Sequence, residues 1–209
     1  MSRSLAADPA AAIAMCEATH TRLMATAERV TDEDVRRPSR LPAWTVAHVL
    51  THIARNADGH VRRLEGALAG EELARYPGGP PQRNAEIEAG ARRGAAEILA
   101  DLRATQHALE ATWERCVTAG WPHAHLLADD SWPTTASPVR RLREVEMHHV
   151  DLGLGYEPSN WPEDYVEWEL PTLLETVPGR MSLLEDKQAL VAWLAGRSSL
   201  PPGIQLAPW

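Results

Sequence analysis

Several features that would point to a function at once are missing from this 209-residue sequence. Its two cysteines, Cys16 and Cys116, are too few for a disulfide framework and too far apart for a CxxC motif. There is no apolar run of about 18 residues, so no transmembrane helix is expected. The first residues lack the apolar stretch of a signal peptide. A cytoplasmic protein that does not bind a membrane is therefore predicted.

Basic residues are also scarce. The chain has 21 Lys and Arg against 29 Asp and Glu, which gives a net charge of -8. No basic stripe with interleaved aromatic residues occurs, so nucleic acid is not an expected partner. Phenylalanine is absent, although eight tryptophans are present. With 44% hydrophobic and 24% charged residues, the composition is that of an ordinary globular protein.

Apolar residues recur with the three-four spacing of amphipathic helices through most of the chain. Segments rich in proline and glycine, such as 76–81, separate these helical stretches. The pattern predicts four helices, at about 8–30, 45–69, 84–119 and 138–152.

Two shorter helices are predicted after these, at about 161–176 and 187–195, followed by a tail at 204–209 that is a candidate strand. The predicted fold is therefore mainly α. A four-helix bundle occupies residues 1–155. A small C-terminal region of helix with some strand, residues 156–209, is expected to contribute to the substrate site.

Two pairs of metal-binding side chains have the spacing of one helical turn. His48 and His52 form one pair, and Glu144 and His148 form the other. Residues four apart lie above one another on one helix face, so two bundle helices can aim these groups at a common point. Two His and one Glu leave a fourth position on zinc open, as in catalytic sites. Asp151, on the same face as Glu144, is a candidate hydrogen-bond partner for a ligand imidazole.

Spacing alone leaves alternatives open. It does not decide between His48 and His52, and a single HxxxH pair is more often part of a helix core than of a metal site. A carboxylate such as Glu144 in a mostly apolar helix needs a cation, which an arginine could supply as well as a metal. If a metal binds, zinc suits the ligands, but iron, nickel or manganese would also fit.

Four segments resemble one family. Residues 44–56, WTVAHVLTHIARN, resemble its signature "GWT…HL…H.A.N", and residues 143–153, REVEMHHVDLG, resemble "REV..H.VDLG". Residues 82–87 resemble the segment that follows its second helix, and 192–197 resemble its C-terminal "AAGR" element. The family is that of the mycothiol-dependent maleylpyruvate isomerases, in the DinB-like superfamily of metal-binding four-helix bundles.

The resemblance implies that His52, Glu144 and His148 bind zinc, and it leaves His48 outside the ligand set. It also implies two catalytic arginines. Arg197 is expected to orient a substrate carboxylate and to contact the cofactor, and Arg83 is the second candidate.

The implied reaction is the mycothiol-dependent isomerisation of maleylpyruvate to fumarylpyruvate, a step in aromatic compound degradation. Zinc activates the thiol, which adds to the cis double bond, the resulting single bond rotates, and the thiol is eliminated. The expected partners are thus a small-molecule substrate and a low-molecular-weight thiol, bound by a monomer or a homodimer.

Two other functions would use the same metal residues. One is a zinc-dependent mycothiol S-transferase acting on electrophiles. The other is a non-enzymatic metal-binding bundle, because a fold does not fix a function. Family members carry strands between the fifth helix and the 192–197 element, and this stretch is short here. Because this stretch is short, the sequence does not decide which substrate is used.

Overall fold

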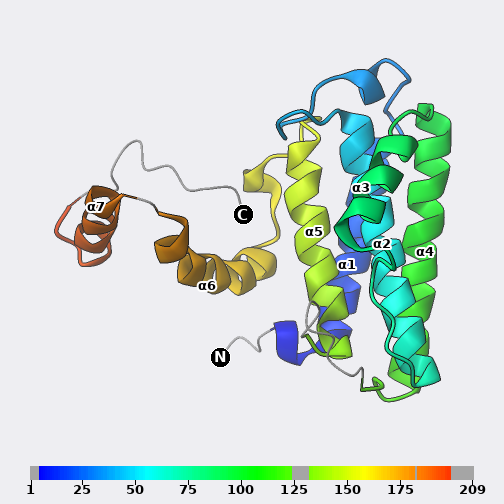
Figure 1. Ribbon diagram of the computed structural model, residues 1–209. Coiled ribbons are helices and arrows are strands. Elements are labelled where there is room, and N and C mark those ends of the chain that lie inside the picture. Colours follow the sequence, from blue (N-terminus) through cyan, green and yellow to red (C-terminus); the bar gives the residue numbers. More distant parts are fainter. Residues whose placement is uncertain (1–4, 124–131, 182, 199–209) are drawn as a thin grey trace. The chain divides into compact units, whose positions relative to one another are not determined.

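A computed structural model describes residues 5–123, 132–181 and 183–198 (Figure 1). Contacts divide the chain into two compact units, Met1–Trp161 and Pro162–Trp209. The first unit is built on four long helices that run side by side (Figure 1). They are α1 (Pro9–Ala27), α2 (Val46–Ala69), α4 (Ala95–Thr118) and α5 (Ser137–Asp151).

Shorter elements connect these helices. Helix α3 (Gly79–Gly90) lies against α2. Single 3-10 turns occur at Leu5–Ala7, Asp34–Arg36, Thr134–Ala136 and Pro158–Asn160. Helix α2 is the centre of the unit, because it packs against α3, α4 and α5, while α1 packs against α4 and α5.

The bundle follows from the apolar periodicity. Leu23 of α1, Ile53 of α2, Leu102 of α4 and Val145 of α5 are fully buried and belong to one core cluster. Burying each such side chain stabilises the fold by roughly 1.5–3 kcal/mol relative to leaving it in water. The predicted mainly α, four-helix-bundle fold is confirmed.

The predicted single helix over 84–119 is wrong, because the chain forms α3 and α4 with a turn at 91–94. The Arg36 guanidinium caps this turn by donating to the carbonyl oxygens of residues 91, 92 and 93 at 2.6–2.9 Å. Gly90 is needed where α3 meets α2, since a Cβ there would lie 2.5 Å from Thr51 Cγ2. The apolar spacing runs through both helices and does not reveal the break.

The second unit contains α6 (Glu163–Arg180) and α7 (Leu184–Leu194). Helix α6 continues past its predicted end at 176 and includes Pro178. The described part of this unit has no strand, and the candidate strand at 204–209 lies outside the described residues. None of the helices in the described ranges is both long enough and apolar enough to cross a membrane.

Candidate metal centre

Helices α2 and α5 bring His52, Glu144 and His148 together. His52 Nε2 lies 3.2 Å from Glu144 Oε2 and 3.0 Å from His148 Nε2. His148 Nε2 lies 3.6 Å from the same Glu144 oxygen. The three potential ligand atoms all lie within 4.8 Å of one another, and no other cluster of this kind occurs among the described residues. Two imidazole nitrogens and one carboxylate oxygen are a donor set that suits zinc.

The cluster is partly shielded from solvent. The side chain of His52 is 5% exposed, that of His148 16% and that of Glu144 24%. His52 points from the buried face of α2, while Glu144 and His148 lie one turn apart on α5. Solvent therefore reaches the two α5 side chains, while His52 is buried.

Electrostatics favours an anionic carboxylate at this point. Burial raises the pKa of Glu144, but hydrogen bonds with His148 and His52 outweigh burial and hold the pKa well below its usual value. Burial lowers the pKa of His52 to about 4, so its imidazole is neutral at pH 7. Both are the protonation states in which these groups bind metals.

Asp151 makes the hydrogen bond that its position on α5 predicts. Its Oδ2 accepts a hydrogen bond from His148 Nδ1 at 2.8 Å. Burial lowers the pKa of His148, but the hydrogen bonds with Asp151 and Glu144 outweigh burial and raise it to about 9. Carboxylates in this position fix the orientation of a ligand imidazole and increase its basicity.

His48 is occupied elsewhere, at the start of α2. Its Nδ1 accepts a hydrogen bond from the backbone N–H of Thr45, the N-cap residue, at 3.2 Å and contacts Thr45 Oγ1 at 2.7 Å. Its Nε2 lies 3.5 Å from Glu88 Oε2. One histidine of the HxxxH pair thus caps the helix and the other joins the cluster.

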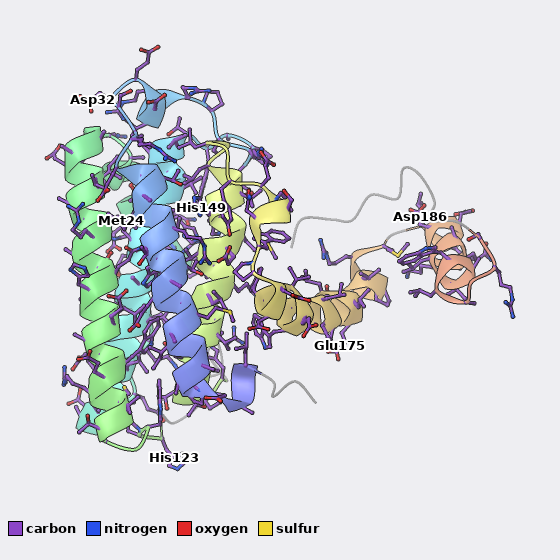
Figure 2. The ribbon with its side chains drawn as sticks, turned by 180° about the vertical axis from the view of Figure 1, so that it is seen from behind. Met24, Asp32, His123, His149, Glu175 and Asp186 are labelled. Carbon is purple, nitrogen blue, oxygen red and sulfur yellow. The ribbon has the colours of Figure 1, made fainter. Side chains whose placement is uncertain are left out.

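The neighbouring His149 also faces away from the cluster. It lies between α5 and α1, where its Nε2 contacts Thr26 Oγ1 at 2.8 Å (Figure 2). Its ring stacks on Tyr156 at 3.8 Å. Of the two consecutive histidines, only His148 faces α2.

The Trp44 side chain lies beside the cluster, a position that the sequence does not predict. Its ring meets that of His52 edge to face, with centroids 5.6 Å apart. The loop before α2 holds it there, and the backbone N–H of Arg40 ties this loop to Asp151 by donating to its carbonyl oxygen at 2.8 Å. Ala43 in the same loop has a φ of 65°, in the left-handed region that favours glycine.

The two predicted arginines lie in different units. Arg83 of α3 is at the cluster, where its Nη2 donates a hydrogen bond to His52 Nδ1 at 2.9 Å. Arg197 follows α7 in the unit Pro162–Trp209, and its side chain is exposed. The contact of Arg83 with a candidate ligand could not be derived from the sequence, since it depends on how α3 packs against α2. The role of Arg197 stays a prediction.

Neither cysteine is suited to act as a nucleophile. Cys16 and Cys116 are both buried. Burial raises the pKa of Cys16 far above its usual value and raises that of Cys116 to about 11. A reactive thiolate in this protein would therefore have to come from a bound thiol.

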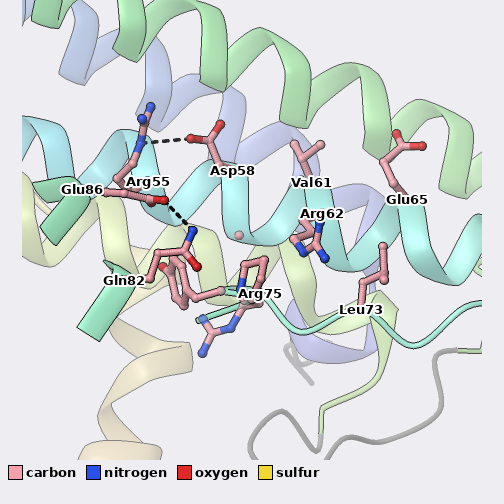
Figure 3. Close-up of a pocket in the computed structure, with 12 residues that line it drawn as sticks. Arg55, Asp58, Val61, Arg62, Glu65, Leu73, Arg75, Gln82 and Glu86 are labelled. Carbon is pink, nitrogen blue, oxygen red and sulfur yellow. Dashed lines mark hydrogen bonds and ion pairs between the residues drawn. The ribbon is translucent and has the colours of Figure 1, made fainter. Parts of the chain in front are cut away.

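A surface groove of about 420 Å³ lies along α2 beneath the loop that leads to α3 (Figure 3). None of the three clustered residues lines it. Two pairs of its polar side chains interact, through the 3.0 Å ion pair of Arg55 with Asp58 and the 2.7 Å hydrogen bond from Gln82 to Glu86. The groove is thus a separate feature from the cluster of His52, Glu144 and His148.

A family model and two solved structures relate this chain to the same group of proteins. Residues 16–153 match the family described as the mycothiol maleylpyruvate isomerase N-terminal domain. Two crystal structures are similar in fold, each with a TM-score of 0.74. One is a mycothiol-dependent maleylpyruvate isomerase, 24% identical, and the other is a histidine-to-alanine mutant of such an enzyme, 23% identical. Each comparison covers 80% of this chain and 70% of the other. Curated protein sequences give no match.

Proposed function

The chain belongs to the mycothiol maleylpyruvate isomerase N-terminal domain family, and on this premise we propose that it isomerises maleylpyruvate to fumarylpyruvate with mycothiol as its thiol cofactor. The observation that carries the proposal is the convergence of His52, Glu144 and His148 within 4.8 Å of one another. We propose that these three side chains hold a divalent metal, with zinc as the first candidate.

Isomerisation by a thiol needs a nucleophile that can leave again. The thiolate forms a carbon–sulfur bond at one carbon of the double bond, and the π electron pair of the double bond moves toward the conjugated carbonyl. The remaining single bond rotates, and the electron pair returns as the carbon–sulfur bond breaks. A metal held by the cluster would supply the thiolate by lowering the pKa of a coordinated thiol. No protein nucleophile is needed, which agrees with the burial of both cysteines.

The protein's own residues then have distinct tasks. Asp151 orients the His148 imidazole through its 2.8 Å hydrogen bond. Trp44 limits access of water beside His52. Arg83 is placed to receive a substrate carboxylate, because a His52 that binds a metal through Nε2 carries its proton on Nδ1. A guanidinium only donates hydrogen bonds, so it would lose its acceptor on His52 and become available to an anion.

We propose that Arg197 binds the second carboxylate of the substrate and also contacts the cofactor. We further propose that residues 156–209 contribute to the substrate site. A guanidinium holds a carboxylate with two parallel hydrogen bonds, which fixes its orientation. Replacing Arg197 by lysine keeps the charge and removes this geometry. The expected result is a higher KM for maleylpyruvate with unchanged zinc binding.

The test is an isomerisation assay of the zinc-loaded full chain, with and without mycothiol. The HxxxH pair offers a matched control, since His52→Gln removes a proposed ligand, whereas His48 lies outside the ligand set and a glutamine at this position can still accept the Thr45 N–H. We expect thiol-dependent formation of fumarylpyruvate that is lost in His52→Gln and kept within a few-fold in His48→Gln.

Two results would contradict the proposal. A stable thioether with an electrophile such as a bimane, without turnover of maleylpyruvate, would identify a thiol S-transferase. Stoichiometric metal binding with neither activity would identify a non-enzymatic metal-binding bundle.

A further inference from the structure

A buried cation lies one helical turn from the metal cluster and has no task in the proposed reaction. Arg141 of α5 is fully buried. Its Nη1 donates to the carbonyl oxygen of Ile53 at 2.7 Å and to Asn56 Oδ1 at 2.9 Å, both on α2. On α5 it precedes Glu144 by three residues, and on α2 its acceptors follow His52 by one and four residues.

The same guanidinium contacts α1 directly and is linked to α4 through His20. Its Nε donates to His20 Nε2 of α1 at 3.2 Å, and His20 Nδ1 donates to Glu110 Oε1 of α4 at 2.7 Å. Burial lowers the pKa of His20 to about 4, so the ring is neutral and can accept on one nitrogen while donating from the other. Arg141, His20, Asn56 and Glu110 thus form a polar network that touches all four long helices.

Such a network is costly to bury. Among the residues that the structure describes, no carboxylate contacts Arg141 directly and no group accepts a hydrogen bond from its Nη2. A well-packed apolar side chain would serve stability at least as well, because a buried charge must be compensated in full to break even. What an apolar side chain cannot do is fix the register of two helices through directed hydrogen bonds.

We propose that Arg141 is a positioning residue for the metal centre: by bonding the α2 backbone beside His52 and the Asn56 amide, it sets the distance between His52 and the ligands Glu144 and His148. The inference rests on the proposed metal site. Arg141 links α2 and α5, the two helices that carry the ligands, about one helical turn away from the ligand residues.

Charge alone predicts the opposite effect. A positive charge one turn from a divalent cation repels it, so its removal would tighten metal binding. Positioning predicts weaker binding for any substitution that loses the forked hydrogen bonds, including Arg141→Lys, which keeps the charge. A purely structural role predicts lower stability with unchanged affinity of the folded protein.

The experiment measures zinc affinity by competition with a chromophoric chelator, using the full chain and the variants Arg141→Lys and Arg141→Met. Denaturant unfolding of the metal-free proteins reports stability separately. Leu64→Ala is the matched control, because Leu64 is fully buried on α2 about three turns beyond His52. If Arg141→Met does not fold, Asn56→Ala removes one acceptor of the same clamp.

We expect both Arg141 variants to bind zinc about 10- to 100-fold more weakly, the range found for residues that orient metal ligands. Asn56→Ala should cost about five-fold, as for one hydrogen bond. The absorption spectrum of the cobalt-loaded variants should shift, since it reports ligand geometry. Leu64→Ala should lower stability and leave affinity and spectrum unchanged.

Three results would overturn the inference or its premise. Tighter zinc binding by Arg141→Met, with no change in Arg141→Lys, would show that only charge matters. Unchanged affinity and cobalt spectrum in all variants would leave Arg141 a structural role alone. If the wild-type chain binds no zinc, the proposed metal site itself fails, whatever the variants do.

Discussion

Asp151 offers a direct test of whether the cluster is organised to bind a metal. Its carboxylate accepts the His148 Nδ1 hydrogen at 2.8 Å and is 23% exposed. Asp151→Asn keeps an oxygen that can accept this hydrogen bond but removes the charge. Asp151→Ala removes both, so the pair separates the effect of charge from that of orientation.

The expected loss can be worked out from this contact. A hydrogen bond to a charged group contributes about 1.5–3 kcal/mol, which corresponds to roughly 10- to 100-fold in affinity. We therefore expect Asp151→Ala to weaken zinc binding by about 10- to 100-fold, within the range known for such partners. Asp151→Asn should lose less, about 10-fold or below.

The loss of zinc affinity in Asp151→Ala should depend on pH, because His148 must release a proton to bind a metal. The pKa of His148 is raised to about 9, so below that pH the wild-type imidazole must release a proton before it binds a metal. Removing Asp151 lowers this pKa and makes the release easier. The measured loss of affinity should therefore be smaller at pH 7 than at pH 9.

The assay is zinc competition against a chelator at both pH values. Asp34→Asn is the control, because Asp34 makes a similar short-range contact with Thr31 at the surface, away from the cluster. A folded Asp151→Ala protein that binds zinc within two-fold of the wild type at pH 9 would refute the reasoning. It would show that the carboxylate does not orient a ligand.

Two further predictions concern stability. Ala43→Gly should raise the free energy of unfolding by about 0.5–1 kcal/mol, since a φ of 65° strains a residue with a Cβ. The same change at the exposed Ala104 of α4 should lower the free energy of unfolding by about 1 kcal/mol. A loss of stability at both positions in urea unfolding would contradict this account. His20 has a pKa of about 4 in the folded chain and an ordinary value of 6.5 when unfolded. The unfolded state therefore binds the extra proton between these values, and stability falls as the pH drops from 6.5 to 4, by about 3 kcal/mol for this residue. His20→Gln should flatten the pH dependence of unfolding in this window, and an unchanged slope would argue against a neutral His20.

The sequence was a good guide wherever structure depends on local periodicity. The apolar stripes predict the helices of the bundle, and α2 begins within one residue of its predicted start at 45. The one-turn spacings brought His52, Glu144 and His148 into consideration, because i and i+4 residues share a helix face. Family resemblance then selected His52 over His48.

Features that depend on contacts between distant segments were not predictable. The break between α3 and α4 is fixed by Arg36, more than 50 residues away in the sequence. The role of His48 as a cap and the contact of Arg83 with His52 depend on side-chain directions that spacing does not give. Arg141 would pass as a surface residue in the sequence, because only the packing of four helices shows that it is buried.

The most direct test of the central claim is a calorimetric titration of the metal-free full chain with zinc, alongside Glu144→Gln and His48→Gln. We predict one zinc ion per wild-type chain, an affinity reduced by orders of magnitude in Glu144→Gln, and near-wild-type binding in His48→Gln. Equal binding by the wild type and Glu144→Gln, or no binding by the wild type, would contradict the assignment of His52, Glu144 and His148 as a metal centre.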